Sequence, residues 1–122
     1  MTSPFGLLAR ALARIDELAA LGPGWNGDGS LPPSTESLSK ARELAELFAR
    51  LGGFVPRIYP TLDGGVQFEW LHNRRDLTVT IHPDATFALF DVDLDTDDEF
   101  TLSCATVSDL THYATTSSPQ SR

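Results

Sequence analysis

Residues 60–70 read PTLDGGVQFEW, and this stretch decides the fold. The apolar side chains of Val66, Phe68 and Trp70 alternate with polar ones, which is the period of a strand that buries one face. The Asp63-Gly64 pair before them is a strong signal for a two-residue type I′ turn, because both residues accept positive φ angles. The stretch therefore predicts a β-hairpin whose second strand has its apolar face in the core.

The residues that follow predict further antiparallel strands. Residues 77–81 alternate apolar side chains with threonine, and His82-Pro83-Asp84 can turn the chain. Strands are also predicted over residues 87–94 and 100–104. Along residues 87–94 the alternation defines two faces, one with Ala88, Phe90, Val92 and Leu94 and the other with Phe87, Leu89, Asp91 and Asp93.

Helical periodicity precedes this sheet. Apolar side chains recur at three- and four-residue spacing in residues 3–21 and 34–51, and Ser34 is a favourable N-cap for the second helix. A glycine-rich connection lies between them, in which Trp25 is predicted to pack as a plug. The sequence predicts an α+β domain with two amphipathic helices on one face of a four- to five-stranded antiparallel meander sheet. Its bounds are residues 1–114, followed by a flexible tail, residues 115–122.

Size and composition bound the class of protein. The chain has 122 residues, of which 41% are hydrophobic and 21% charged, and this suits one soluble domain. Its one cysteine, Cys104, fits a reducing compartment. The sequence holds no apolar run near the roughly 20 residues of a membrane span, and no secretory signal pattern. We therefore expect a cytoplasmic protein that does not insert into a membrane.

Negative charge is concentrated in the last third of the chain. Residues 1–75 contain eight acids and eight bases, whereas residues 76–122 contain nine acids and one base and so carry the whole net charge of −8. Nucleic acid attracts lysine and arginine, so direct nucleic-acid binding is not expected of an acidic chain with a pI near 4.6. The expected partner is instead a basic protein surface.

The candidate partner-binding residues come from this acidic third and from two aromatic side chains. Closely spaced carboxylates repel one another unless a cation or a basic partner compensates them, and a charged edge strand that prevents aggregation is the structural alternative. Trp25 and Phe87 are the candidate apolar anchors. The predicted acidic residues are Asp91, Asp93, Asp95, Asp97, Asp98 and Glu99.

Sequence patterns for catalysis, cofactors or metals are weak. The glycine-rich segment lacks both a preceding strand and the lysine of a phosphate-binding loop. A calcium loop of the EF-hand type starting at Asp91 would need glycine where Thr96 stands. The histidines and Cys104 do not have the spacing of a zinc site. We therefore predict no catalytic residue, no cofactor and no metal ligand.

Two motifs together resemble a group of small bacterial proteins of uncharacterised function. One motif is the GWNGDGS sequence of residues 24–30, with Pro32-Pro33-Ser34 before an amphipathic helix. The other is the PTLDGGVQFEW sequence of residues 60–70. The resemblance spans about residues 18–82 and implies no activity or ligand. The chain is similar in size to antitoxins, immunity proteins and phage-encoded inhibitors.

Three functions follow from these observations. The leading hypothesis is a non-enzymatic module that acts as a stoichiometric inhibitor or antitoxin-like partner of a basic protein, such as a nuclease or CRISPR effector. The second is a small metal-dependent hydrolase that uses the loops of Asp28 and Asp63, or His82. The third is a homodimeric structural module that pairs through an edge strand, so the oligomeric state, monomer or homodimer, stays open.

Overall fold

A computed structural model describes residues 4–51, 56–72 and 74–104. Two helices precede five strands, in the order that the sequence predicts. The elements are α1 (Pro4–Ala19), α2 (Thr35–Leu51), β1 (Arg57–Pro60), β2 (Val66–His72), β3 (Arg75–Ile81), β4 (Phe87–Asp93) and β5 (Glu99–Cys104). The predicted domain end at residue 114 and the predicted tail lie outside the described residues.

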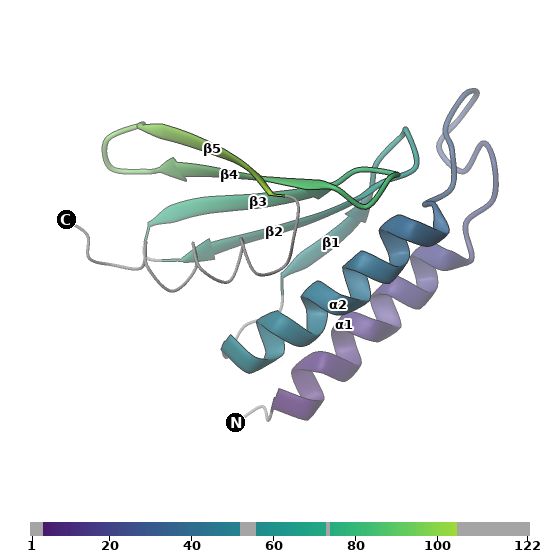
Figure 1. Ribbon diagram of the computed structural model, residues 1–122, viewed down its shortest axis with the longest axis horizontal. Coiled ribbons are helices and arrows are strands. Elements are labelled where there is room, and N and C mark those ends of the chain that lie inside the picture. Colours follow the sequence, from purple (N-terminus) through teal and green to yellow (C-terminus); the bar gives the residue numbers. More distant parts are fainter. Residues whose placement is uncertain (1–3, 52–55, 73, 105–122) are drawn as a thin grey trace.

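The five strands form one antiparallel sheet in the order β1-β2-β3-β4-β5, so each strand pairs with its neighbours in the chain. The two helices lie together on one face of the sheet (Figure 1), where α1 contacts β1 and α2 contacts β2 and β3. β5 is the strand farthest from them. The predicted α+β meander with a helix pair on one face is confirmed.

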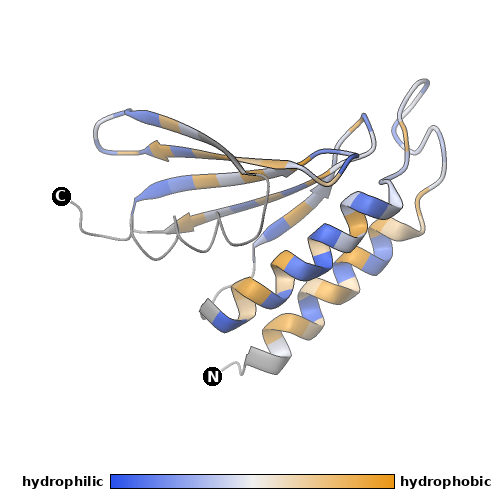
Figure 2. Cartoon of the chain, in the orientation of Figure 1, coloured by the Kyte–Doolittle hydropathy of each residue, from blue (hydrophilic) through white to orange (hydrophobic). Residues whose placement is uncertain are grey.

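The core lies between the helix pair and the sheet. The strand register aligns Phe68, Val79 and Leu89 in one row, and all three are buried. From α2, the ring of Phe48 packs against those of Phe68 and Trp70, with centroid separations of 5.6 and 4.7 Å. Figure 2 shows apolar and polar residues in turn along both helices, as expected of amphipathic helices. The inner face predicted for the second strand is therefore correct.

The β1–β2 loop differs from the predicted two-residue type I′ turn. Of the Asp63-Gly64 pair only Gly64 has a positive φ, 97°, whereas the type I′ turn needs two. Thr61 instead closes a longer loop: its amide donates to the Gly65 carbonyl (3.1 Å) and its hydroxyl accepts from the Gly65 amide (2.8 Å). A β-carbon at Gly65 would lie 2.2 Å from the carbonyl oxygen of Ile81, so this close approach requires glycine.

The connection between the helices packs against this loop. The Leu31 amide donates to the Leu62 carbonyl over 2.9 Å. Ser34 caps α2 as predicted, because its Oγ accepts from the Ser37 amide (3.0 Å), and the same Oγ donates to the Pro83 carbonyl (2.6 Å). These bonds join the helix connection, the β1–β2 loop and the β3–β4 turn at one end of the sheet, which we call the loop end.

Candidate protein-interaction surface

Most of the predicted acids lie at the opposite end of the strands from the loop end. They belong to the turn that joins β4 to β5, where Figure 2 shows a concentration of hydrophilic residues. We call residues 93–99 the acidic tip. Its acids are Asp93, Asp95, Asp97, Asp98 and Glu99.

Asp93 orders the acidic tip from within. Its Oδ1 accepts from the amides of Asp95 (2.9 Å) and Thr96 (3.3 Å), in the pattern of an Asx turn. Its own amide donates to the Asp98 carbonyl, and its carbonyl accepts from the Asp97 amide. Asp97 adopts a φ of 64°, in the left-handed region that aspartate tolerates better than most residues. The role of Asp93 is therefore largely local, in holding the turn.

Arg74 ties the tip to the turn between β2 and β3. The Leu94 amide donates to the Arg74 carbonyl (2.8 Å), and Arg74 Nε donates to Asp95 Oδ1 (2.6 Å). Asp97, Asp98 and Glu99 are exposed and form no ion pair with any residue in the described ranges. These last three carboxylates are therefore the ones best placed to meet an external cation.

Two predicted partner-binding residues are buried instead. Pairing of Ile81 with Phe87 places Phe87 and Leu89 on the core side of β4, and the Phe87 side chain is only 1% exposed. Asp91 follows on the same side, is 2% exposed, and is held by the guanidinium of Arg75, whose Nε lies 3.1 Å from Asp91 Oδ1. Alternation defined the two faces of this strand, and its register with β3 decides which one faces the core.

Trp25, which the sequence predicts as a plug, is not part of the buried core cluster, and it lies far from the acidic tip. Its side chain is half-buried, and its Nε1 donates to the Leu31 carbonyl over 2.7 Å at the loop end. The tip lies beyond the other end of β4, a strand of seven residues and thus about 20 Å long. Trp25 and the acidic tip therefore do not form one continuous docking surface.

Sequence reasoning missed the apolar residues that do accompany the tip. On the outer face of the sheet, away from the helices, the register aligns Leu71, Asp76, Val92 and Glu99 in one row. Leu71 is 69% exposed, and Phe90, on the same face of β4, is 39% exposed. Leu94 in the tip is also exposed. The alternation of Phe90, Val92 and Leu94 along residues 87–94 was the available signal. We call Leu71, Phe90 and Leu94 the apolar border of the tip.

The loops named by the hydrolase hypothesis lie side by side at the loop end. Leu31 and Asp63 form an isolated bridge, and both Asp28 and Asp63 are exposed. Asp63 Oδ1 accepts from the hydroxyl of Thr61 (2.6 Å). Within residues 4–51, 56–72 and 74–104, the structure contains no group of three or more histidine, cysteine, aspartate or glutamate side chains placed to hold a metal ion.

The β3–β4 turn at the loop end contains one carboxyl with a perturbed pKa. The Thr86 hydroxyl donates to Asp84 Oδ1 over 2.6 Å and the Thr86 amide over 3.0 Å. These hydrogen bonds, the hydroxyl's first, hold the pKa of Asp84 below its usual value of 3.8, and the nearby His82 adds to the effect.

The free edge of β1 bears on the edge-pairing hypothesis. Among the strands of the described ranges β1 pairs with β2 alone, so its other edge faces away from the sheet. Arg14 Nε donates to the Ile58 carbonyl at this edge (2.9 Å), and Pro60 has no amide hydrogen to offer. Both features oppose strand addition at β1.

Comparisons of the chain with protein-family models, curated proteins and solved structures find no match in any of the three. The resemblance of residues 24–34 and 60–70 to small bacterial proteins therefore stays a prediction. None of the helices, over the residues that the structure describes, combines the length and the apolar character needed to cross a membrane.

Proposed function

We propose that this protein is a non-enzymatic interaction module whose acidic tip and apolar border dock onto a basic protein surface. It would act as a stoichiometric inhibitor or antitoxin-like partner. The observation that supports this function is the juxtaposition of an apolar border with three exposed carboxylates, Asp97, Asp98 and Glu99, which form no ion pair within the described part of the chain.

The two components would have different roles in binding. Exposed carboxylates attract a basic surface over about 8–10 Å at physiological ionic strength, and so raise the association rate. Burial of exposed apolar side chains, here Leu71 and Phe90, would supply most of the favourable binding free energy, because the hydrophobic effect is the dominant favourable term in most protein association. If the basic surface is one that a nuclease or CRISPR effector uses for nucleic acid, the carboxylates would compete with phosphates for the same arginines and lysines.

The first experiment tests charge and position together. The partner is isolated from the native host by affinity capture and mass spectrometry, purified, and titrated calorimetrically against this protein at 50, 150 and 500 mM salt. One variant neutralises the tip with Asp97→Asn, Asp98→Asn and Glu99→Gln. The matched control neutralises three exposed α2 acids, with Glu36→Gln, Glu43→Gln and Glu46→Gln.

We expect the tip variant to lose affinity and much of the salt dependence, whereas the α2 variant keeps both. Equal losses in the two variants would show that only net charge matters, and would contradict docking through the tip.

A second pair of variants tests the apolar border. Leu71→Ser should raise the dissociation constant by about tenfold or more, because full burial of a leucine side chain contributes about 1.5–3 kcal/mol. Leu31→Ser, at the loop end, is the control, because Leu31 is also exposed, at 51%. Unchanged binding by the Leu71 variant would remove the border from the proposed interface.

A further inference from the structure

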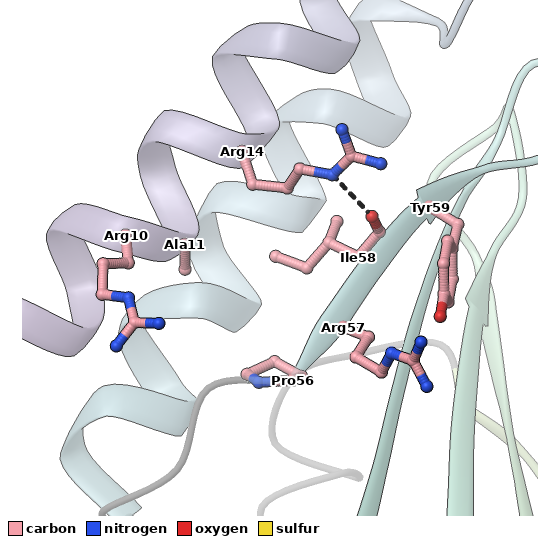
Figure 3. Close-up of a pocket in the computed structure, with 7 residues that line it drawn as sticks. All are labelled: Arg10, Ala11, Arg14, Pro56, Arg57, Ile58 and Tyr59. Atoms are coloured by element: carbon pink, nitrogen blue, oxygen red, sulfur yellow. Dashed lines mark hydrogen bonds between the residues drawn. The ribbon is translucent and has the colours of Figure 1, made fainter.

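The two edges of the sheet differ in whether their backbone groups are available for pairing. In an antiparallel sheet, alternate residues of an edge strand direct their N–H and C=O groups away from the neighbouring strand. The Thr61 amide donates to the Gly65 carbonyl in continuation of the β1–β2 ladder, and by alternation Ile58 and Pro60 are the outward residues of β1. Arg14 Nε donates to the Ile58 carbonyl, as the dashed line in Figure 3 marks, and Pro60 has no amide hydrogen. Both outward positions of β1 therefore oppose the addition of another strand.

The outer edge of β5 lacks this protection. The Asp93 amide donates to the Asp98 carbonyl at the start of the β4–β5 ladder. By alternation from this bond, the outward residues of β5 are Glu99, Thr101 and Ser103. Within the described ranges, no hydrogen bond engages their outward backbone groups. β5 contains neither proline nor lysine, which commonly prevent strand addition at a sheet edge, so this edge is able to pair with another strand.

An exposed apolar residue lies on the inner side of this edge strand. Pairing of Asp91 with Phe100 places Phe100 on the face of the sheet that holds the core, yet its side chain is 48% exposed. Figure 1 shows β5 as the strand farthest from the helix pair. By alternation, Leu102 occupies a position on the same face. A further strand beside β5 would extend this face and reduce the exposure of Phe100.

We propose that β5 pairs in antiparallel fashion with β5 of a second copy of this chain, about a two-fold axis at Thr101. The outward groups of one copy then meet the outward groups of the other, because residues 99, 101 and 103 pair among themselves. The opposed residues of the two copies are Thr101 with Thr101, Glu99 with Ser103, and Phe100 with Leu102.

These cross-strand pairs are what favour a second copy over an extended segment of another protein. Any extended segment can form the backbone hydrogen bonds, but opposed threonines and opposed apolar residues add stability to an antiparallel pair. In this register Thr101 faces its own kind, and Phe100 faces Leu102. The pairing would join two five-stranded sheets into one continuous sheet with both helix pairs on the same face.

The distribution of charge permits this pairing. Glu99 is two residues from the axis, so the two copies of Glu99 would lie four residues apart along the strands, which is about 14 Å. Salt screens exposed charges beyond about 8 Å at physiological ionic strength, so their repulsion would be weak. The two acidic tips would lie at opposite ends of the joint, and the dimer does not depend on the function proposed for the tip.

Sedimentation velocity of the full chain, at concentrations from about 5 µM to 1 mM, measures the self-association. A joint of two edge strands buries less area than a standard protein interface, so we expect a weak dimer with a dissociation constant on the order of 100 µM. Thr101→Pro removes an outward amide from each copy at the axis and leaves the β4–β5 hydrogen bonds in place. It should raise the dissociation constant by about tenfold or more.

Thr101→Val is the matched control, because it keeps the amide and the β-branched shape and should still form the dimer. The amide spectrum of each variant at low concentration verifies that it is folded. The tip variant with Asp97→Asn, Asp98→Asn and Glu99→Gln should form the dimer as well as the wild type does, so that a failure of tip docking and a failure of the dimer are distinguishable. A wild type that stays monomeric up to 1 mM, or equal association of Thr101→Pro, would overturn the proposal.

Disulfide trapping tests the register, in a background of Cys104→Ser. Thr101→Cys would place two thiols opposite one another at the axis, where the Cα atoms of a hydrogen-bonded pair lie about 5.5 Å apart, within the range of a disulfide. Ser103→Cys is the control, because its two copies would lie about 14 Å apart along the strands. We expect covalent dimers from Thr101→Cys alone. Equal trapping of both variants, or trapping only when the two are mixed, would rule out the axis at Thr101.

Discussion

The two ends of the sheet use polar residues in different ways. At the loop end, the hydroxyls of Ser34 and Ser37 are bonded to backbone carbonyls, and the close approaches require glycine. At the acidic tip, backbone bonds around Asp93 order the turn, while Asp97 and Asp98 extend into solvent. The loop end thus satisfies its two serine hydroxyls within the chain, whereas the tip leaves the carboxylates of Asp97 and Asp98 available for another molecule.

The largest expected effect tests this contrast within β4. Phe87→Ala should destabilise the fold by about 3–5 kcal/mol, because the side chain is fully buried and its loss leaves a cavity. Phe90→Ala, on the outer face, should cost only about 1 kcal/mol. Urea unfolding of both variants measures the difference. Similar losses in the two variants would contradict the assignment of inner and outer faces.

The next prediction compares two ion pairs formed by neighbouring arginines, one with a buried aspartate and one with an exposed aspartate. Asp91→Asn removes the buried carboxylate that pairs with Arg75, and we expect it to lower the free energy of unfolding by about 2–4 kcal/mol. This is less than the full value for a buried ion pair, because Arg75 is partly exposed. Asp95→Asn breaks the exposed pair with Arg74 and should cost less than about 1 kcal/mol.

Replacement of the buried pair by apolar side chains is the control for this prediction. Arg75→Met combined with Asp91→Leu should recover much of the stability that Asp91→Asn loses, because neither partner is then left as an uncompensated charge. Thermal and urea unfolding would measure all three proteins. If Asp95→Asn destabilised the fold as much as Asp91→Asn, the tip would be part of the folding unit rather than a surface available for binding.

The sequence was sufficient to predict the elements of the fold, because each has a clear local period. The alternation of Val66, Phe68 and Trp70 determined the second strand, and the N-cap preference of Ser34 determined the start of α2. Local periodicity failed for residues 87–94, where both faces are partly apolar. Only the pairing of Ile81 with Phe87 decides which face is buried.

The functional sites could not be predicted in the same way, because they depend on contacts between residues that are distant in the sequence. Arg75 is sixteen residues from the Asp91 that it holds, and Arg14 is forty-four residues from the Ile58 carbonyl to which it donates. Neither separation has a sequence signature. The charge count identified the acidic third of the chain. It could not predict that Asp91 is buried and paired with Arg75 whereas Asp97 and Asp98 are exposed.

The smallest expected effect concerns Asp84, at the loop end. Its pKa is depressed in the folded state by the Thr86 hydroxyl and amide, so its carboxylate stabilises the fold above the unfolded-state pKa, near 3.8. That contribution is lost as the pH falls through the lower, folded-state pKa. Asp84→Asn should therefore lower the free energy of unfolding at pH 7. The difference in unfolding free energy between this variant and the wild type should disappear at acidic pH.

Urea unfolding at pH 7, 5, 3 and 2 measures the difference in unfolding free energy between the wild type and Asp84→Asn. An NMR titration of side-chain carboxyl carbons measures the pKa of Asp84 directly. Thr86→Val supplies the matched change, because it removes the hydroxyl donor and keeps the Asp84 charge and the Thr86 amide position. It should raise the pKa of Asp84 towards 3.8. If this difference in unfolding free energy stayed constant down to pH 2, the Asp84 charge would not stabilise the loop end. The contrast between the two ends would then depend on the serine and glycine contacts alone.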